Sequence, residues 1–195
     1  CHAVDILQCH QLVAIGIDPL DRNVGNRHFR NTYGLNQTIA LLHDNIPRHN
    51  ISVKWLPKDI NNQGDGSHNG ENYFAYSFYV KNKGSEVVNY WYEIIIDDVI
   101  RNADEAIRVM VYRNGDMKLY AKANKKTGEA EEGTTVFYSD KEVAVEQRKG
   151  FSPGDVDEFT VVVFVEGDDP DCLDEIIGGE MKMHMEITEE HIKQG

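Results

Sequence analysis

The sequence has few cysteines and no long apolar run. Its three cysteines are too few for a disulfide scaffold, and no C-x-x-C pair indicates a structural zinc or redox site. One bridge and one free thiol are compatible with this number. No stretch approaches the roughly 18–20 consecutive apolar residues of a membrane helix, so we expect no membrane insertion.

Basic residues are scarce relative to acidic ones. The chain has 20 Lys and Arg against 33 Asp and Glu, which gives a formal net charge of -13. This charge repels nucleic acid and anionic lipid and favours cations or basic partners. With 195 residues and 41% hydrophobic content, the chain is expected to form one domain, or one domain with an arm.

Catalytic motifs are also missing. The sequence contains no G-x-S-x-G nucleophile elbow, P-loop, G-x-G-x-x-G fingerprint or H-E-x-x-H zinc motif. Its Ser, His and Asp residues are dispersed over predicted strands and loops. We therefore predict that the protein is not an enzyme and needs no cofactor, with Ca²⁺ as the one ion to consider.

The N-terminal region is predicted to be an extended arm. The chain starts at Cys1 rather than Met and lacks a leading charged-then-apolar segment, so a processed or trimmed form is expected, with a lipidated Cys1 as a variant. Residues 3–17 form the longest mostly apolar stretch, and Gly16 and Pro19 interrupt any helix there. The expected division is an arm at 1–17 and a β-sandwich domain at 18–195.

The middle of the chain consists of short β-type runs at regular spacing. Aromatic-rich runs at 73–82 and 87–98 flank a Lys-Gly-Ser turn and predict a hairpin, and Asn114-Gly115 predicts a second hairpin with a type I′ turn. Before them, residues 35–44 have helical spacing and 51–57 predict a brief strand. About eight to ten strands at this spacing indicate an antiparallel sandwich.

The last third of the chain contains its clearest pattern. Residues 159–165 form an apolar strand, and residues 181–187 alternate between apolar and polar side chains. Between them lies an acidic corner, and we interpret the two strands as a hairpin. Met181, Met183, Met185 and Ile187 are expected to face a core, and Lys182, His184 and Glu186 to face out.

The cluster of carboxylates in the acidic corner has two interpretations, a cation site or the start of a short helix. The candidate ligands of Ca²⁺ are Asp168, Asp169, Asp171 and Asp174. The same residues also suit the first turn of a short helix begun by Pro170, where acidic side chains meet the positive end of the helix dipole. The 59–72 loop resembles a calcium loop only loosely, because Gly70 stands where the terminal Glu belongs. Aromatic residues in 73–92 suggest either a glycan-stacking platform or core packing.

Several segments of the sequence resemble those of a known protein family. NYFAYSFYVKNKG, VVNYWYEIIIDD, EAIRVMVYRNG, FSPGDVDEFTVVVFVEGDDPDC and IIGGEMKMHMEITEEH resemble secreted proteins of Gram-positive bacteria related to the TasA/camelysin family. The resemblance covers residues 70–192. It implies a jelly-roll-like sandwich that is exported by a dedicated signal peptidase to the cell surface. It also implies subunits that form biofilm-matrix fibres by lending an N-terminal strand to the next subunit.

Together these features predict a structural subunit of an extracellular filament, with itself as partner in a head-to-tail homopolymer. An apolar, β-capable arm can add to an open sheet edge through backbone hydrogen bonds, and a contact that does not close makes a filament. The donor positions expected in the arm are Val4, Ile6, Leu7, Leu12, Val13, Ile15 and Ile17. Cys9 and Cys172 are candidates for a disulfide, within a chain or between subunits. The alternative is a monomeric cell-surface module that binds a glycan or Ca²⁺.

Overall fold

The computed structural model describes residues 12–15, 37–40, 51–167 and 179–191. Short 3₁₀ helices connect some of its strands. The strands are β1 (Leu12–Ile15), β2 (Gln37–Ala40), β3 (Gly66–Ser67), β4 (Tyr73–Asn82), β5 (Val88–Ile100), β6 (Ile107–Arg113), β7 (Asp116–Ala121), β8 (Thr135–Val136), β9 (Glu142–Phe151), β10 (Val156–Val165) and β11 (Glu180–His191). The 3₁₀ helices are η1 (Val53–Trp55), η2 (Ile60–Asn62) and η3 (Ala103–Glu105).

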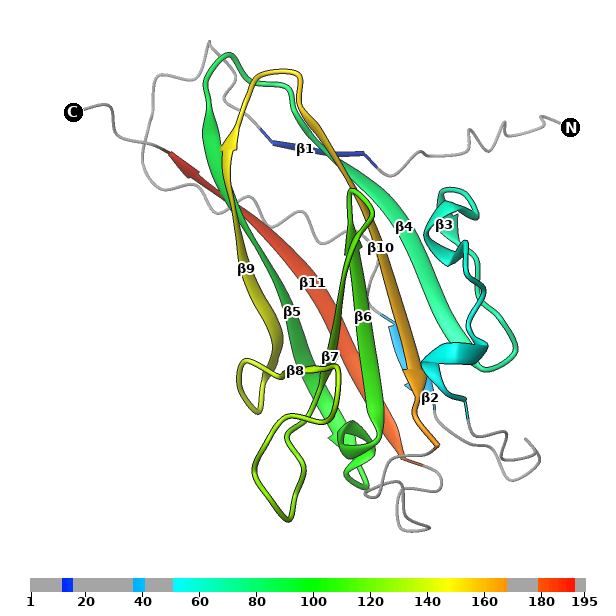
Figure 1. Cartoon of the computed structure of the whole chain (residues 1–195). Helices are drawn as coiled ribbons and strands as arrows, with labels where there is room; N and C mark the ends of the chain where they lie inside the picture. Colours follow the sequence, from blue (N-terminus) through cyan, green and yellow to red (C-terminus); the bar gives the residue numbers. More distant parts are fainter. Residues whose placement is uncertain (1–11, 16–36, 41–50, 168–178, 192–195) are drawn as a thin grey trace, which may run out of the picture.

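These strands form two sheets that pack face to face (Figure 1). Sheet A has the order β1-β4-β10-β6-β7-β8, and β3 pairs with a further part of β4. Sheet B has the order β2-β11-β5-β9. Most neighbouring strands are antiparallel, and the exceptions are β1 with β4 and β7 with β8. The predicted all-β sandwich is confirmed.

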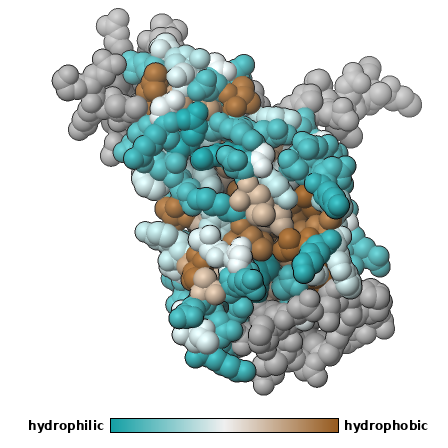
Figure 2. Space-filling model, in the orientation of Figure 1, coloured by the Kyte–Doolittle hydropathy of each residue, from teal (hydrophilic) through white to brown (hydrophobic). Residues whose placement is uncertain are grey.

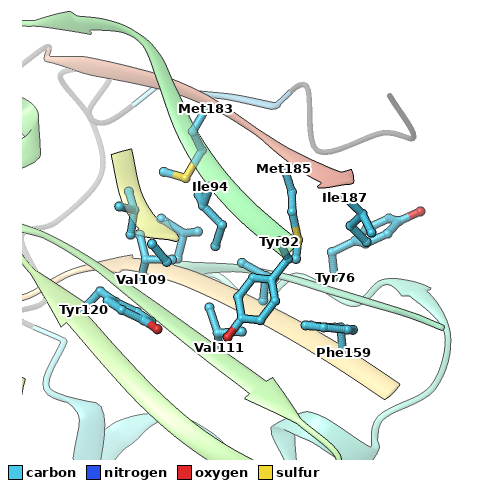
Figure 3. Close-up of a cluster of buried hydrophobic side chains, with 14 of the residues drawn as sticks. Tyr76, Tyr92, Ile94, Val109, Val111, Tyr120, Phe159, Met183, Met185 and Ile187 are labelled. Carbon is cyan, nitrogen blue, oxygen red and sulfur yellow. The ribbon is translucent and has the colours of Figure 1, made fainter. Parts of the chain in front are cut away.

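The main core lies between the two sheets (Figure 3). Phe159 of β10 is fully buried at its centre, stacked on Phe78 of β4 with ring centroids 5.2 Å apart. Tyr92 of β5 meets the same ring edge-on at 5.2 Å across the sandwich. Offset and edge-to-face aromatic contacts of this kind add to the large apolar area that each ring buries. Tyr76, Phe78, Tyr90 and Tyr92 are therefore core residues, whereas Trp91 is half-buried.

A second, smaller core covers the other face of sheet A. Ile51, Leu56 and Ile60, from the segment that contains η1 and η2, pack with residues of β4, β6 and β10. Sheet A is thus covered on both faces, which requires apolar side chains on both sides of its central strand β10. This explains why β10 is a continuous apolar run, whereas strands with one solvated face alternate.

Strand β11 of sheet B shows that alternation. Met181, Met183, Met185 and Ile187 are buried, as predicted, while Lys182 is exposed and His184 and Glu186 are half-buried. On the outer face the His184 ring nitrogens lie 2.9 Å from Asp97 Oδ1 and 3.3 Å from Glu186 Oε1. The core-facing set follows from the two-residue period of a strand.

Two predicted hairpins are wrong, because consecutive strands cross between the sheets. Strand β4 belongs to sheet A and β5 to sheet B, and the same holds for β10 and β11. The strands themselves are where the sequence placed them. A Gly-containing connection can either turn a strand back beside its neighbour or carry it across a core, and local sequence does not distinguish these outcomes.

Other local predictions gave mixed results. Asn114-Gly115 does join β6 and β7 as a hairpin, with φ of 52° and 87°. The predicted helix at 35–44 is wrong, since β2 within it is a strand paired with β11. The predicted strand at 51–57 is wrong as well, because η1 occupies its middle.

The visible surface is mostly hydrophilic, with smaller groups of exposed apolar residues (Figure 2). Among the described residues, the most exposed large apolar side chains are Trp55 and Tyr138. Within the described residues no helix is long and apolar enough to cross a membrane.

Candidate functional site

The candidate site is the β4 edge, which we define as the backbone groups of β4 that face away from β10. The backbone N–H of Asn82 donates to Asp155 O at 3.0 Å, and its C=O accepts from Gly154 at 2.9 Å, so Asn82 faces the β10 side. Successive residues of a strand direct these groups alternately to its two sides. Residues 73, 75, 77, 79 and 81 therefore present their donors and acceptors to the β4 edge.

The first half of the β4 edge is covered by residues 66–70, which include β3. The backbone N–H of His68 donates to Ala75 O at 2.9 Å, and that of Gly70 donates to Tyr73 O at 3.1 Å. The Asn69 side chain accepts from the Ala75 N–H at 3.0 Å. Gly66 is paired with Ser77. This segment satisfies the edge as far as Ser77.

The His68 side chain connects this covering segment to the outer core. Its ring nitrogens lie 3.1 Å from Gly66 O and 3.0 Å from Ile60 O. Ile60 is buried against sheet A in the smaller core. The cover over the first half of the β4 edge is therefore anchored by side-chain packing as well as by backbone hydrogen bonds.

The second half of the β4 edge is covered by β1, in parallel register. Leu12 is paired with Tyr79, Val13 with Val80, Ala14 with Lys81 and Ile15 with Asn82. Without β1, the edge-facing backbone groups of Tyr79 and Lys81 would lack this strand partner. An unpaired strand edge of this kind is a template for another strand.

Tyr79 marks the position opposite Leu12. Its hydroxyl lies 3.5 Å from Glu158 Oε1. The side-chain hydrogen bond with Asp65 raises the pKa of Tyr79 to about 12, with further contributions from burial and from the Glu158 carboxylate. Asp65 precedes β3, so this side chain links the segment over the first half of the edge to the register position of β1.

Tyr79 predicts a specific loss of stability at alkaline pH. Its pKa is raised above the ordinary value of 10.0, so the unfolded chain ionises first. The stability from this tyrosine is present below pH 10 and is lost as the pH rises through about 12. Urea midpoints measured at several pH values in this window should fall more steeply for the natural chain than for Tyr79→Phe. Superimposable profiles would contradict the assignment. Tyr92 has a pKa raised to about 12 by burial and contributes equally to both proteins.

Asn82 ends the β4 edge. Its side chain is buried and donates to Glu86 O at 2.9 Å and Phe151 O at 2.8 Å, while its Oδ1 accepts from Gly84 N at 2.9 Å. These three bonds fix the turn that sends the chain to the other sheet.

The predicted site residues fall partly on this edge. Of the donor positions, Leu12, Val13 and Ile15 lie on β1, and Val4, Ile6, Leu7 and Ile17 lie outside the described residues. The candidate cation ligands Asp168, Asp169, Asp171 and Asp174 and the candidate disulfide partners Cys9 and Cys172 lie outside them as well. Within the described part of the chain, no three His, Cys, Asp or Glu residues are placed to hold a metal ion. The β3 contribution to the edge was missed, because its two-residue strand has no sequence signal.

A second group of polar side chains surrounds the buried Asp157 carboxylate near the β6–β7 turn. Asp157 accepts hydrogen bonds from the Tyr90 hydroxyl at 2.5 Å, Asn114 Nδ2 at 2.8 Å and Arg148 Nε at 3.2 Å. Asn114 Oδ1 also accepts from Glu158 N at 2.8 Å. Burial and the Asp157 carboxylate raise the pKa of Tyr90, so it remains a neutral donor. With both carboxylate oxygens bonded, this group has the character of a structural network that joins both sheets.

Comparisons with known proteins add little. No protein-family model matches the chain, and no curated protein matches it. Among solved structures it is similar to dimeric latent PorU from Porphyromonas gingivalis, with 11% identity and a TM-score of 0.27. The match covers 65% of this chain and 11% of the PorU chain, and it carries no functional conclusion.

Proposed function

We propose that the chain is a structural subunit of an extracellular filament that assembles by donor-strand exchange, with β1 as donor and the β4 edge as acceptor. The single observation that carries the proposal is the pairing of β1 on this edge, where it adds a short strand to one end of β4. In a filament the same pairing would be made by β1 of the neighbouring subunit. Main-chain hydrogen bonds along a sheet edge are a general mode of strand addition.

The construction of the rest of the sandwich supports this proposal. The two described cores are built from residues 51–187, in both sheets and in the segment over sheet A. Strand β1 adds four residue pairs at the rim. A subunit with this division can exchange its rim strand while its cores stay intact. The resemblance to TasA/camelysin-related proteins is consistent with secretion by a Gram-positive bacterium and a place in the biofilm matrix.

Proline substitution in β1 tests the proposal. The double substitution Val13→Pro and Ala14→Pro removes two adjacent backbone N–H groups. Because successive residues of a strand direct these groups to alternate sides, one of the two removed donors faces β4. We expect this variant to remain folded but to form no filaments under conditions in which the natural chain does, as seen by electron microscopy and sedimentation. Val13→Ala is the matched control and should assemble, because it keeps the backbone donor.

Two results would overturn the proposal. One is normal filament formation by the double proline variant, since β1 would then be dispensable. The other is a natural chain that stays monomeric at all concentrations. A monomer would favour the alternative, a surface module that binds a glycan or Ca²⁺. Calorimetric titration with Ca²⁺ would test its metal form.

A further inference from the structure

Both N-terminal strands lie on the same side of the sandwich. At one side β7 of sheet A faces β9 of sheet B, because Lys118 Nζ and the Tyr120 hydroxyl lie 2.6 and 3.1 Å from Glu146 Oε1. The strand orders place β4 and β11 at the opposite side, with β1 next to β4 and β2 next to β11. In Figure 3, Tyr76 of β4 and Ile187 of β11 lie at one end of the core and Tyr120 at the other. The first two strands therefore close one side together, one on each sheet.

On that side the two strands lie at opposite ends. Strand β1 is paired with the C-terminal end of β4, up to Asn82. The connection from Asn82 leads directly to Val88, which is paired with His191 at the C-terminal end of β11. Strand β2 is paired with residues Glu180 to Met183, the other end of β11. Together β1 and β2 thus hold both ends and both sheets of this side.

Each of these pairings is short. Strand β1 makes four residue pairs with β4, and β2 makes four with β11. Joining two subunits costs translational and rotational freedom, which a single four-residue ladder offsets poorly. Two ladders on one continuous segment share that cost, because the second binds intramolecularly once the first is in place.

We propose that the segment exchanged between subunits carries both strands, so that β1 and β2 of one chain close the β4 and β11 edges of the next chain together. The inference rests on the proposed function and extends its donor beyond residue 17. The partner is a second copy of this chain, held at two edges rather than one.

Cross-linking of full-length chains tests which strands are exchanged. Thr38 is paired with Lys182, and Ala14 with Lys81. In a background with the three native cysteines replaced by serine, chains carrying Thr38→Cys are mixed as monomers with chains carrying Lys182→Cys, assembled, and treated with a short bismaleimide. A parallel mixture uses Ala14→Cys with Lys81→Cys. Each chain carries one new cysteine, so any product of two different chains is intermolecular.

We expect covalent heterodimers from both mixtures, at a yield at least several-fold above that of Thr38→Cys mixed with Tyr138→Cys. Tyr138 is exposed, and its backbone N–H bonds to Val143 of β9, the strand at the opposite edge of sheet B from β2, so it controls for random collisions. Heterodimers from the 14–81 mixture alone would overturn the inference and leave the proposed function standing. Heterodimers from the 38–182 mixture alone, or no heterodimers from either mixture, would overturn both the inference and the proposed function.

A second measurement covers the case in which the serine background fails to assemble. A photo-crosslinking amino acid at position 38 of the otherwise natural chain is used in filaments grown from ¹⁴N and ¹⁵N chains. Adducts of mixed isotope composition at β11 support the inference. Adducts within single chains only overturn it.

Discussion

Replacing Phe159 with alanine is expected to lower the free energy of unfolding by about 3–5 kcal/mol, the usual cost of removing a fully buried aromatic ring. Phe159 has no exposed surface, and its ring contacts Phe78 in its own sheet and Tyr92 in the other. The cavity would lie between the sheets, where neither can close it without breaking strand pairing. Urea denaturation of the monomer measures the loss.

The matched control is Tyr138→Ala. Tyr138 is an aromatic residue that is 67% exposed, so its removal should change stability by no more than about 0.5 kcal/mol. Equal losses in the two variants would show that the Phe159 ring does not hold the sheets together. A Phe159→Leu variant should recover part of the stability, because it refills much of the space.

Replacing Asp157 with alanine is expected to lower the free energy of unfolding by about 2–3 kcal/mol, because it leaves a buried hydrogen-bond partner unsatisfied. Asp157 is 2% exposed and accepts from Tyr90, Asn114 and Arg148. Its removal leaves the buried Tyr90 hydroxyl without this acceptor and takes one partner from the half-buried Arg148 side chain. The loss should appear in the urea midpoint of the variant.

Asp155→Ala provides the control for the Asp157 variant. Asp155 also lies near Arg148, with its Oδ2 3.6 Å from Nη2, but its side chain is 42% exposed, and the same oxygen accepts a hydrogen bond from Ser152 N. Its replacement should cost about 1 kcal/mol. If the two alanine variants lose the same stability, the interaction with Arg148 is a general charge effect, and the network around Asp157 does not carry the stability.

These two effects matter for the proposed assembly, because they separate folding from polymerisation. Phe159 and Asp157 lie in the sandwich, whereas the donor positions lie on β1. Variants at Phe159 and Asp157 should unfold more readily as monomers. The double proline variant of β1 should keep a stable monomer and lose only the filament.

The order of strands along the chain was largely predictable, because each strand is a local pattern. Alternation in β11 indicated its buried methionines, and Asn114-Gly115 indicated a tight turn, since both residues adopt positive φ. Similarly, the apolar run at 159–165 indicated the strand that the structure shows as part of β10. Propensity and periodicity act within a few residues, and these features depend on little else.

The partner of each strand was not predictable in the same way. The connection after β4 was read as a hairpin turn, yet the buried Asn82 side chain directs the chain to sheet B through bonds to Glu86 and Phe151. Residues 35–44 have helical spacing, but β2 within them is a strand that pairs with β11. In both cases a contact distant in sequence overrides the local preference.

The sequence by itself determined that this protein is an antiparallel β-sandwich with an apolar, β-capable N-terminal region, because hydrophobic periodicity and turn residues encode those features locally. The tertiary structure alone decided which edge that region joins. Only the folded sheets bring the backbone groups of Tyr79 and Lys81 to a rim beside β1 and place β2 at the other end of the same side. Every residue except proline carries the same backbone donor and acceptor, so the local side-chain pattern does not show which edge is joined, and the choice emerges only from the assembled fold.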